Sequence, residues 1–255
     1  MLRSLKKIYL VLDIICNLLD LSCLMSINLF TLLEQLRVVC FASLSVTIVS
    51  AFFMGLVFSL QIVKEFLYLN AITLVGSILS ISFLRELSPV LTSIILVGKV
   101  GSLFTSELAT MAITEQVDAL YVLGINPINY LILPRIISFL FILPLLNFIS
   151  FITSIISSCF LCFVLYNIDP KIFFISAFSV LSLSDIFKSL FKILIFAFFI
   201  ALVSCICGFT ASGGSKGVGT STTYSVVTSL LLIFILDFIL SYYMFTDIDS
   251  SLKTL

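Results

Sequence analysis

The chain has 255 residues, a length at which a single domain is the default. Hydrophobic residues make up 61% and charged residues 10%, whereas a soluble domain carries about 25% charged residues. This composition excludes a soluble globular enzyme and predicts a polytopic membrane protein. The zero net charge removes bulk attraction to nucleic acid, and the absence of histidine argues against acid–base catalysis and most zinc sites.

Four of the seven cysteines lie in apolar runs, Cys159 and Cys162 in one and Cys205 and Cys207 in another. A metal or redox cysteine pair needs thiolates, which apolar surroundings disfavour. We therefore predict buried, neutral cysteines and no metal site.

Five charge-free stretches are long enough to cross a bilayer, which takes about 20 helical residues. Helix is expected because a single segment in lipid must satisfy its own backbone hydrogen bonds. The stretches are 38–63, 66–84, 136–168, 193–215 and 217–236.

Residues 2–35 have a different pattern, in which acidic residues interrupt apolar stretches after an early basic cluster. We predict a helix that lies in the membrane interface, with a poor first span as the alternative. The basic cluster places this side of the chain on the cytoplasmic or equivalent side.

The region 66–111 is too long for one simple span, and we expect a break or kink near Ser88–Pro89. Beyond it, polar residues fall on one helical face. The stripe either packs helices together or borders a polar cavity or a partner subunit. Its residues are Thr92, Lys99, Ser102, Ser106 and Thr110.

Segment 112–128 is the most polar part of the middle of the chain. We expect Thr114 to cap a short helix with Glu115 and Asp118 in its first turn, and Gly124 to end it. Such a short surface helix between two spans suits docking to a soluble partner.

Residues 136–168 form one long span, 169–192 a partly amphipathic surface segment, and 224–246 a last span that contains Asp237. The Gly-rich turn at 211–222 lacks the lysine spacing of a phosphate-binding loop. No other segment supplies that motif, so we expect no nucleotide hydrolysis by this chain.

Three motifs then identify a family. They are RELSPVLT at 85–92, TEQVDAL at 114–120 and YLILPR at 130–135, and they closely resemble the MlaE-type permeases of lipid-transporting ABC systems. Glycines at 98 and 101 and Glu107 match as well, whereas Lys99 stands where the family usually has arginine.

The resemblance implies an all-α membrane protein with about five spans. It implies an N-terminal interfacial helix at 1–36, a permease domain at 37–246 with a coupling helix at about 114–124, and a tail at 247–255. It also implies a homodimer that works with a separate ATP-binding subunit and a lipid-carrying MCE-domain protein. The coupling helix would use Thr114, Glu115, Gln116, Asp118, Ala119, Leu120, Leu123 and Gly124.

On this reading the chain is a non-enzymatic permease for a membrane lipid such as a phospholipid, without a cofactor. Charged groups at membrane depth are costly and usually functional, so we expect lipid-cavity or gating roles; structural ion pairs are the alternative. The candidates are Arg85, Glu86, Lys99, Ser102, Ser106, Glu107 and Asp237. An ion-driven secondary transporter and a non-transporting membrane scaffold are the rival functions.

Composition also suggests an origin. The 26 phenylalanines and the absence of tryptophan fit an AT-rich genome. Members of the family that resemble this chain are plastid-encoded. We therefore expect a plastid inner envelope membrane, with a bacterial inner membrane as the alternative.

Overall fold

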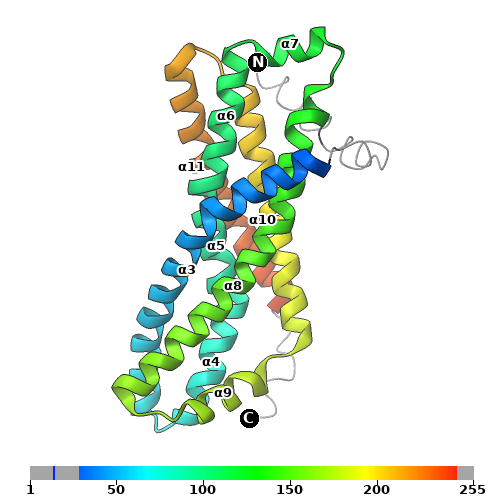
Figure 1. Cartoon of the computed structure of the whole chain (residues 1–255). Helices are drawn as coiled ribbons and strands as arrows, with labels where there is room; N and C mark the ends of the chain where they lie inside the picture. The colour runs from blue at the N-terminus through cyan, green and yellow to red at the C-terminus, as the bar shows by residue number, and fades with distance from the viewer. Residues whose placement is uncertain (1–13, 15–28, 246–255) are drawn as a thin grey trace. The chain divides into compact units, whose positions relative to one another are not determined.

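The computed structural model describes residue 14 and residues 29–245, which form helices and no strand (Figure 1). Within these residues, five helical stretches are long and apolar enough to cross a membrane, as the sequence predicted. Their bounds are Phe30–Tyr68, Ile72–Ile113, Ile128–Tyr166, Leu183–Phe209 and Gly214–Met244.

Helix α3 (Leu29–Tyr68) forms the first span, and the second combines several short helices. Helix α7 (Gln116–Val122) lies between the second and third spans, and α9 (Pro170–Val180) between the third and fourth. The remaining α-helices are α4 (Val75–Ser82), α5 (Ser88–Leu96), α6 (Ser102–Ile113), α7 (Gln116–Val122), α8 (Leu133–Tyr166), α9 (Pro170–Val180), α10 (Leu183–Phe209) and α11 (Gly214–Phe245).

The interfacial helix expected at 2–35 falls mostly outside the described residues. Residues 29–35 form the first turns of α3, which runs without interruption through the expected domain boundary at 36/37.

The irregularity expected near Ser88–Pro89 takes the form of a wider π turn, Phe83–Leu87, which ends directly before α5 begins at Ser88. A further π turn, Val97–Gly101, follows α5. Proline has no N–H to donate to the carbonyl four residues earlier, which belongs to Arg85. Lys192 Nζ donates to that carbonyl over 3.1 Å. The chain thus replaces the missing backbone donor with a lysine from α10.

A second π turn–proline pair occurs where the third span begins. The π turn Ile128–Ile132 ends two residues before Pro134, just as Phe83–Leu87 ends two residues before Pro89. Pro144, by contrast, lies inside the continuous helix α8. π turns absorb an extra residue within a helix and often mark functional positions. Both of these turns overlap motifs that resemble the permease family, RELSPVLT at 85–92 and YLILPR at 130–135.

One compact unit contains residues 29–43, 94–143 and 195–233 of the described chain. Phe104 packs edge-on against Phe139 in its core, with ring centroids 6.1 Å apart. Thr105 Oγ1 lies 3.0 Å from the Ser204 carbonyl oxygen and 2.9 Å from Ser225 Oγ. This one hydroxyl therefore links α6, α10 and α11.

The other compact unit contains residues 44–93, 144–194 and 234–245 of the described chain. Ser154 and Ser158 of α8 donate hydrogen bonds to the carbonyls of Ala51 and Gly55, at 3.2 Å and 3.1 Å. Its apolar core consists of Val63, Val75, Leu79, Phe83, Ile155, Cys159, Cys162, Ile168 and Phe173. The two cysteines are buried free thiols, as predicted, and so are Cys205 and Cys207 of the first unit.

The prediction of a surface segment over 169–192 is wrong for its second half. Asp169 does cap α9, because its side chain accepts a hydrogen bond from the Lys171 backbone N–H. Asp185 and Lys192, however, are only 4% and 0% exposed. Both belong to α10 and face oppositely charged partners, which is why burial of these charges is tolerated.

Candidate functional site

Helix α7 begins and ends at backbone conformations that turn the chain sharply. Glu115 precedes it with φ of 59°, and Gly124 follows it with φ of 75°. The N–H of Gly124 bonds to the Tyr121 carbonyl, and that of Ile125 bonds to the Leu120 carbonyl. These two bonds form a Schellman motif, which confirms Gly124 as the end of the short helix.

The predicted start of this helix is wrong. Thr114 ends α6 instead of capping α7, and its hydroxyl donates to the Thr110 carbonyl over 2.8 Å. Glu115 occupies the cap position of α7 without a side-chain cap bond. A threonine that follows a helix can satisfy a carbonyl one turn back, and that local option prevails here.

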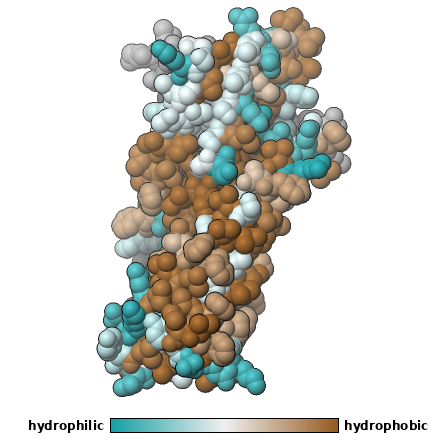
Figure 2. All heavy atoms as spheres, turned by 60° about the vertical axis from the view of Figure 1, so that its left-hand side comes forward, coloured by the Kyte–Doolittle hydropathy of each residue, from teal (hydrophilic) through white to brown (hydrophobic). Residues whose placement is uncertain are grey.

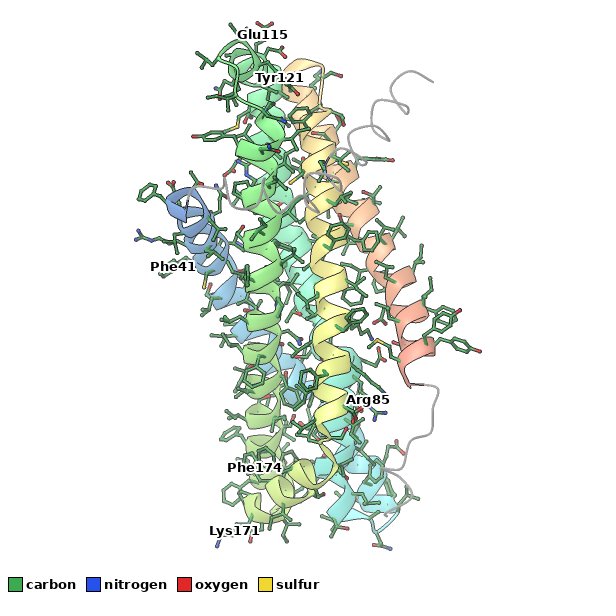
Figure 3. All side chains as sticks on the ribbon, turned by 90° about the vertical axis from the view of Figure 1, so that its right-hand side faces the viewer. Phe41, Arg85, Glu115, Tyr121, Lys171 and Phe174 are labelled. Carbon is green, nitrogen blue, oxygen red and sulfur yellow. The ribbon has the colours of Figure 1, made fainter. Side chains whose placement is uncertain are left out.

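The far end of α7 exposes apolar side chains. Tyr121, Val122 and Leu123 are 53%, 88% and 73% exposed, whereas Val117 is buried. Figure 3 labels Glu115 and Tyr121 together at the α7 end of the second and third spans. The segment therefore presents acidic and apolar groups to its surroundings at the end of a hairpin between two spans.

A cluster of five charged side chains occupies the second unit. Arg85 Nη2 lies 2.9 Å from Asp185 Oδ1, and Figure 3 labels Arg85 beside α10. Lys192 Nζ lies 2.8 Å from Glu86 Oε2 and 2.6 Å from Asp237 Oδ1. Three carboxylates thus face two cations.

Ser241 of α11 completes this cluster. Its hydroxyl lies 2.8 Å from Glu86 Oε1 and 2.9 Å from Lys192 Nζ. The Lys192 side chain is fully buried, but those of Glu86 and Asp237 are 42% and 22% exposed. The Lys192 cation at the centre of the cluster is therefore buried, whereas the carboxylates of Glu86 and Asp237 are partly exposed.

A separate ion pair lies in the first unit. Arg135 Nη2 is 2.9 Å from Glu107 Oε2, and the guanidinium lies over the Phe104 ring at 5.7 Å from its centroid. The Arg135 side chain is 4% exposed and that of Glu107 is 38% exposed. This pair connects α6 to α8, the helices on either side of α7 in the chain.

The polar stripe on the second span does not form one surface. Thr92 is fully buried and donates to its own helix at the Ser88 carbonyl. Lys99 and Thr110 are exposed, and Ser102 and Ser106 are partly exposed. Gly98 is exposed as well, and no side chain of the described structure lies where its Cβ would be.

Sequence reasoning therefore named four of the seven members of the two ion-pair groups: Arg85, Glu86, Glu107 and Asp237. It missed the roles of Arg135, Asp185 and Lys192. Asp185 and Lys192 each lie near the start of a strongly apolar span, and a charge in that position was a usable signal. The structure does not bring Lys99, Ser102 and Ser106 into either group.

Comparison with known proteins supports the resemblance. The family model "Permease MlaE" matches residues 32–243. A "Probable ABC transporter permease protein ycf63" of Pyropia yezoensis is 50% identical over 226 residues, 89% of this chain and 86% of that protein. A "Probable ABC transporter permease protein" of Synechocystis sp. is 45% identical over 219 residues, 86% of this chain and 83% of that protein.

A plant protein is similar too. "Protein TRIGALACTOSYLDIACYLGLYCEROL 1, chloroplastic" of Arabidopsis thaliana is 43% identical over 221 residues, which are 87% of this chain and 63% of that protein.

Proposed function

Since the chain belongs to the MlaE permease family, we propose that it is the membrane-spanning subunit of an ATP-driven lipid transporter and moves a membrane lipid. It is an integral membrane protein, and a permease of the ABC class works with an ATP-binding partner. Lipid as the cargo, the homodimer and an MCE-domain partner are part of the proposal, as is the absence of enzymatic activity in this chain.

Helix α7 is the observation that carries the proposal. A membrane subunit without a nucleotide site needs an exposed element to which a soluble ATP-binding subunit can bind. The α7 segment joins two spans, exposes acidic Glu115 and Asp118, and exposes Tyr121 to Leu123. Exposed apolar groups flanked by charges are typical of a docking surface. We assign the coupling role to Thr114, Glu115, Gln116, Asp118, Ala119, Leu120, Leu123 and Gly124.

The charged groups are assigned to the lipid path. In the five-charge cluster around Lys192, the carboxylates of Glu86 and Asp237 are partly exposed. We assign these carboxylates and Arg85 to contact with a lipid head group, or to ion pairs that break and re-form during transport. Lys99 is exposed, and Ser102 and Ser106, which follow it on the same span, are partly exposed, so the three form a short polar strip on an otherwise apolar span. Such a strip is costly against lipid tails, and we place it at a cavity formed with the second copy, together with Glu107.

The proposed location is a plastid envelope membrane. The support is the similarity to a protein described as chloroplastic, together with the composition bias of this chain. A bacterial inner membrane is the alternative, since the Synechocystis relative is 45% identical.

The test is co-purification with the ATP-binding subunit. Leu123→Asp, or the double reversal Glu115→Lys with Asp118→Lys, should abolish association and ATP-dependent lipid transfer in proteoliposomes. Leu69→Asp is the matched control, because Leu69 is 70% exposed and Leu123 is 73% exposed. It lies at the other end of a span and should leave association unchanged.

Three outcomes would count against the proposal. Unchanged association in the α7 variants would remove α7 as the docking element. Lipid or solute transport by the chain without any ATP-binding partner would favour an ion-driven transporter, and a purified dimer that retains no lipid would favour a scaffold.

A further inference from the structure

A cavity of about 340 Å³ lies where α10 ends and α11 begins. Thr210 and Ser212 line it from the turn, and Thr220, Ser221 and Tyr224 line it from the first turns of α11. Its volume is at the lower end of the range of small-molecule sites, about 300–1,000 Å³. None of the residues described as lining it carries a charge.

The lining hydroxyls offer hydrogen-bond acceptors more than donors. Thr210, Thr220 and Ser221 donate their single protons to the carbonyls of Ile206, Gly217 and Val218, at 2.8, 3.1 and 2.9 Å. A hydroxyl that has donated its proton still has lone pairs to accept with. A phosphate brings only acceptors, and none of the described lining residues offers it a cation; Lys216, next to Gly217, is exposed and does not line the cavity. A polyol, by contrast, brings donors that fit these oxygens.

The position of the cavity points to a lipid head group. The fourth span ends at Phe209 and the fifth begins at Gly214, so the cavity lies at the level where a bilayer gives way to water. Tyr224, which is 57% exposed, adds an aromatic face with a polar tip, as is usual at that level. Figure 2 shows a pale, Gly-, Ser- and Thr-rich zone in its upper part, where α6 and the start of α11 face the viewer.

The cavity also lies on the α7 side of the membrane. Two spans, α8 and α10, separate α7 from this turn along the chain. A Cβ at Gly217 would lie 3.7 Å from Ile113 Cδ1, at the end of α6 that leads into α7.

We propose that this cavity binds an uncharged lipid head group rich in hydroxyls, such as a sugar, and so selects neutral glycolipid over phospholipid. The proposal rests on the proposed function, because it takes the ligand to be the transported membrane lipid. It goes further in naming the head-group class and the residues that select it.

The experiment measures lipid retention by the full chain without the ATP-binding subunit, so it is independent of docking at α7. The chain is reconstituted in phosphatidylcholine nanodiscs that contain monogalactosyldiacylglycerol, phosphatidylglycerol or phosphatidylethanolamine. It is then extracted, and bound lipid is counted by native mass spectrometry. The galactolipid should be retained in preference to the other two.

Thr220→Val with Ser221→Ala should lower galactolipid retention about tenfold, the loss expected for two hydrogen bonds. Thr223→Val is the matched control. Thr223 is exposed, lies outside the cavity, and makes the same kind of bond to its own helix, at the Gly219 carbonyl over 2.9 Å. It should retain galactolipid normally.

A photoreactive galactolipid on the unmodified chain gives a second readout that needs no variant. Its cross-links should map to residues 207–224. Equal retention of the three lipids, equal effects of the cavity and control variants, or cross-links confined to other segments would each overturn the proposal. Loss of association in the α7 variants would leave this result unchanged, so the two proposals fail separately.

Discussion

Arg135 Nη2 and Glu107 Oε2 lie 2.9 Å apart and join the helix that enters the α7 hairpin to the helix that leaves it. The guanidinium is 4% exposed and lies over Phe104, which packs against Phe139 of α8. Nε and Nη1 of Arg135 have no hydrogen-bond partner among the described residues. Glu107 is thus the one described carboxylate that neutralises this buried charge.

Removing Glu107 should therefore destabilise the first unit. We expect Glu107→Leu to lower the free energy of unfolding by about 1–3 kcal/mol, less than the ~3–5 kcal/mol of a fully buried pair, because the Glu107 side chain is 38% exposed. Glu107→Gln keeps an acceptor and should cost less. A thiol-reactive dye can follow unfolding, because Cys159, Cys162, Cys205 and Cys207 are buried.

The swap Glu107→Arg with Arg135→Glu is the control. Part of the lost stability should return if the pair itself matters. A double variant no more stable than the worse single variant would contradict this account.

Lys192 is the most consequential charge of the second unit. Lys192→Met would leave Glu86 and Asp237 facing each other without their cation and the Arg85 carbonyl without its donor. We expect a loss of about 1–3 kcal/mol in stability, below the ~3–5 kcal/mol of a fully buried pair because the Glu86 and Asp237 side chains are 42% and 22% exposed, and loss of ATP-dependent lipid transfer in proteoliposomes. Lys171→Met, at an exposed position of α9, should have neither effect.

Adding Glu86→Gln and Asp237→Asn to Lys192→Met separates structure from transport. The triple variant removes the repulsion and should recover stability. If it also recovered transport, the cluster would be structural only, contrary to its proposed role in the lipid path.

Much of this architecture was predictable because a segment that crosses lipid must be apolar, helical and about 20 residues long. Five apolar stretches gave five spans, and Gly124 ended α7 because only a few residues adopt positive φ without strain. Charge-free length, however, is a poor guide to where a span ends. The second span continues past Arg85 and Lys99, and the fourth begins at Leu183, before Asp185 and Lys192.

The site was less predictable, because pairing across the chain decides whether a charge can be buried. The sequence alone predicts Lys192 at the surface. It is buried because Glu86 and Asp237, which lie 106 and 45 positions away in the chain, neutralise its charge. The group that replaces the missing donor at Pro89 was unpredictable for the same reason. A lysine distant in sequence supplies the missing donor, and no local pattern encodes that contact.

Close packing of α4 against α9 gives a further prediction. A methyl group at Gly76 would overlap Ser176 and the Phe173 carbonyl of α9. Gly76→Ala should therefore lower stability by about 1–3 kcal/mol in the dye assay. Gly98→Ala is the matched control, because nothing of the described structure lies within 4 Å of its added Cβ. It should be neutral or slightly stabilising, since alanine favours helix by about 0.5–1 kcal/mol. Equal effects at the two positions would contradict this packing.

Glu115 combines a strained backbone with a charge on the proposed docking element, and two substitutions separate these features. Its φ of 59° costs a non-glycine residue about 1 kcal/mol or more. Glu115→Gly should relieve that strain and raise stability, whereas Glu115→Ala should not. Both variants lack the carboxylate, so both should weaken association with the ATP-binding subunit to a similar degree in a pull-down titration. If only the glycine variant lost association, the fixed backbone at residue 115, and not its charge, would be what the partner requires.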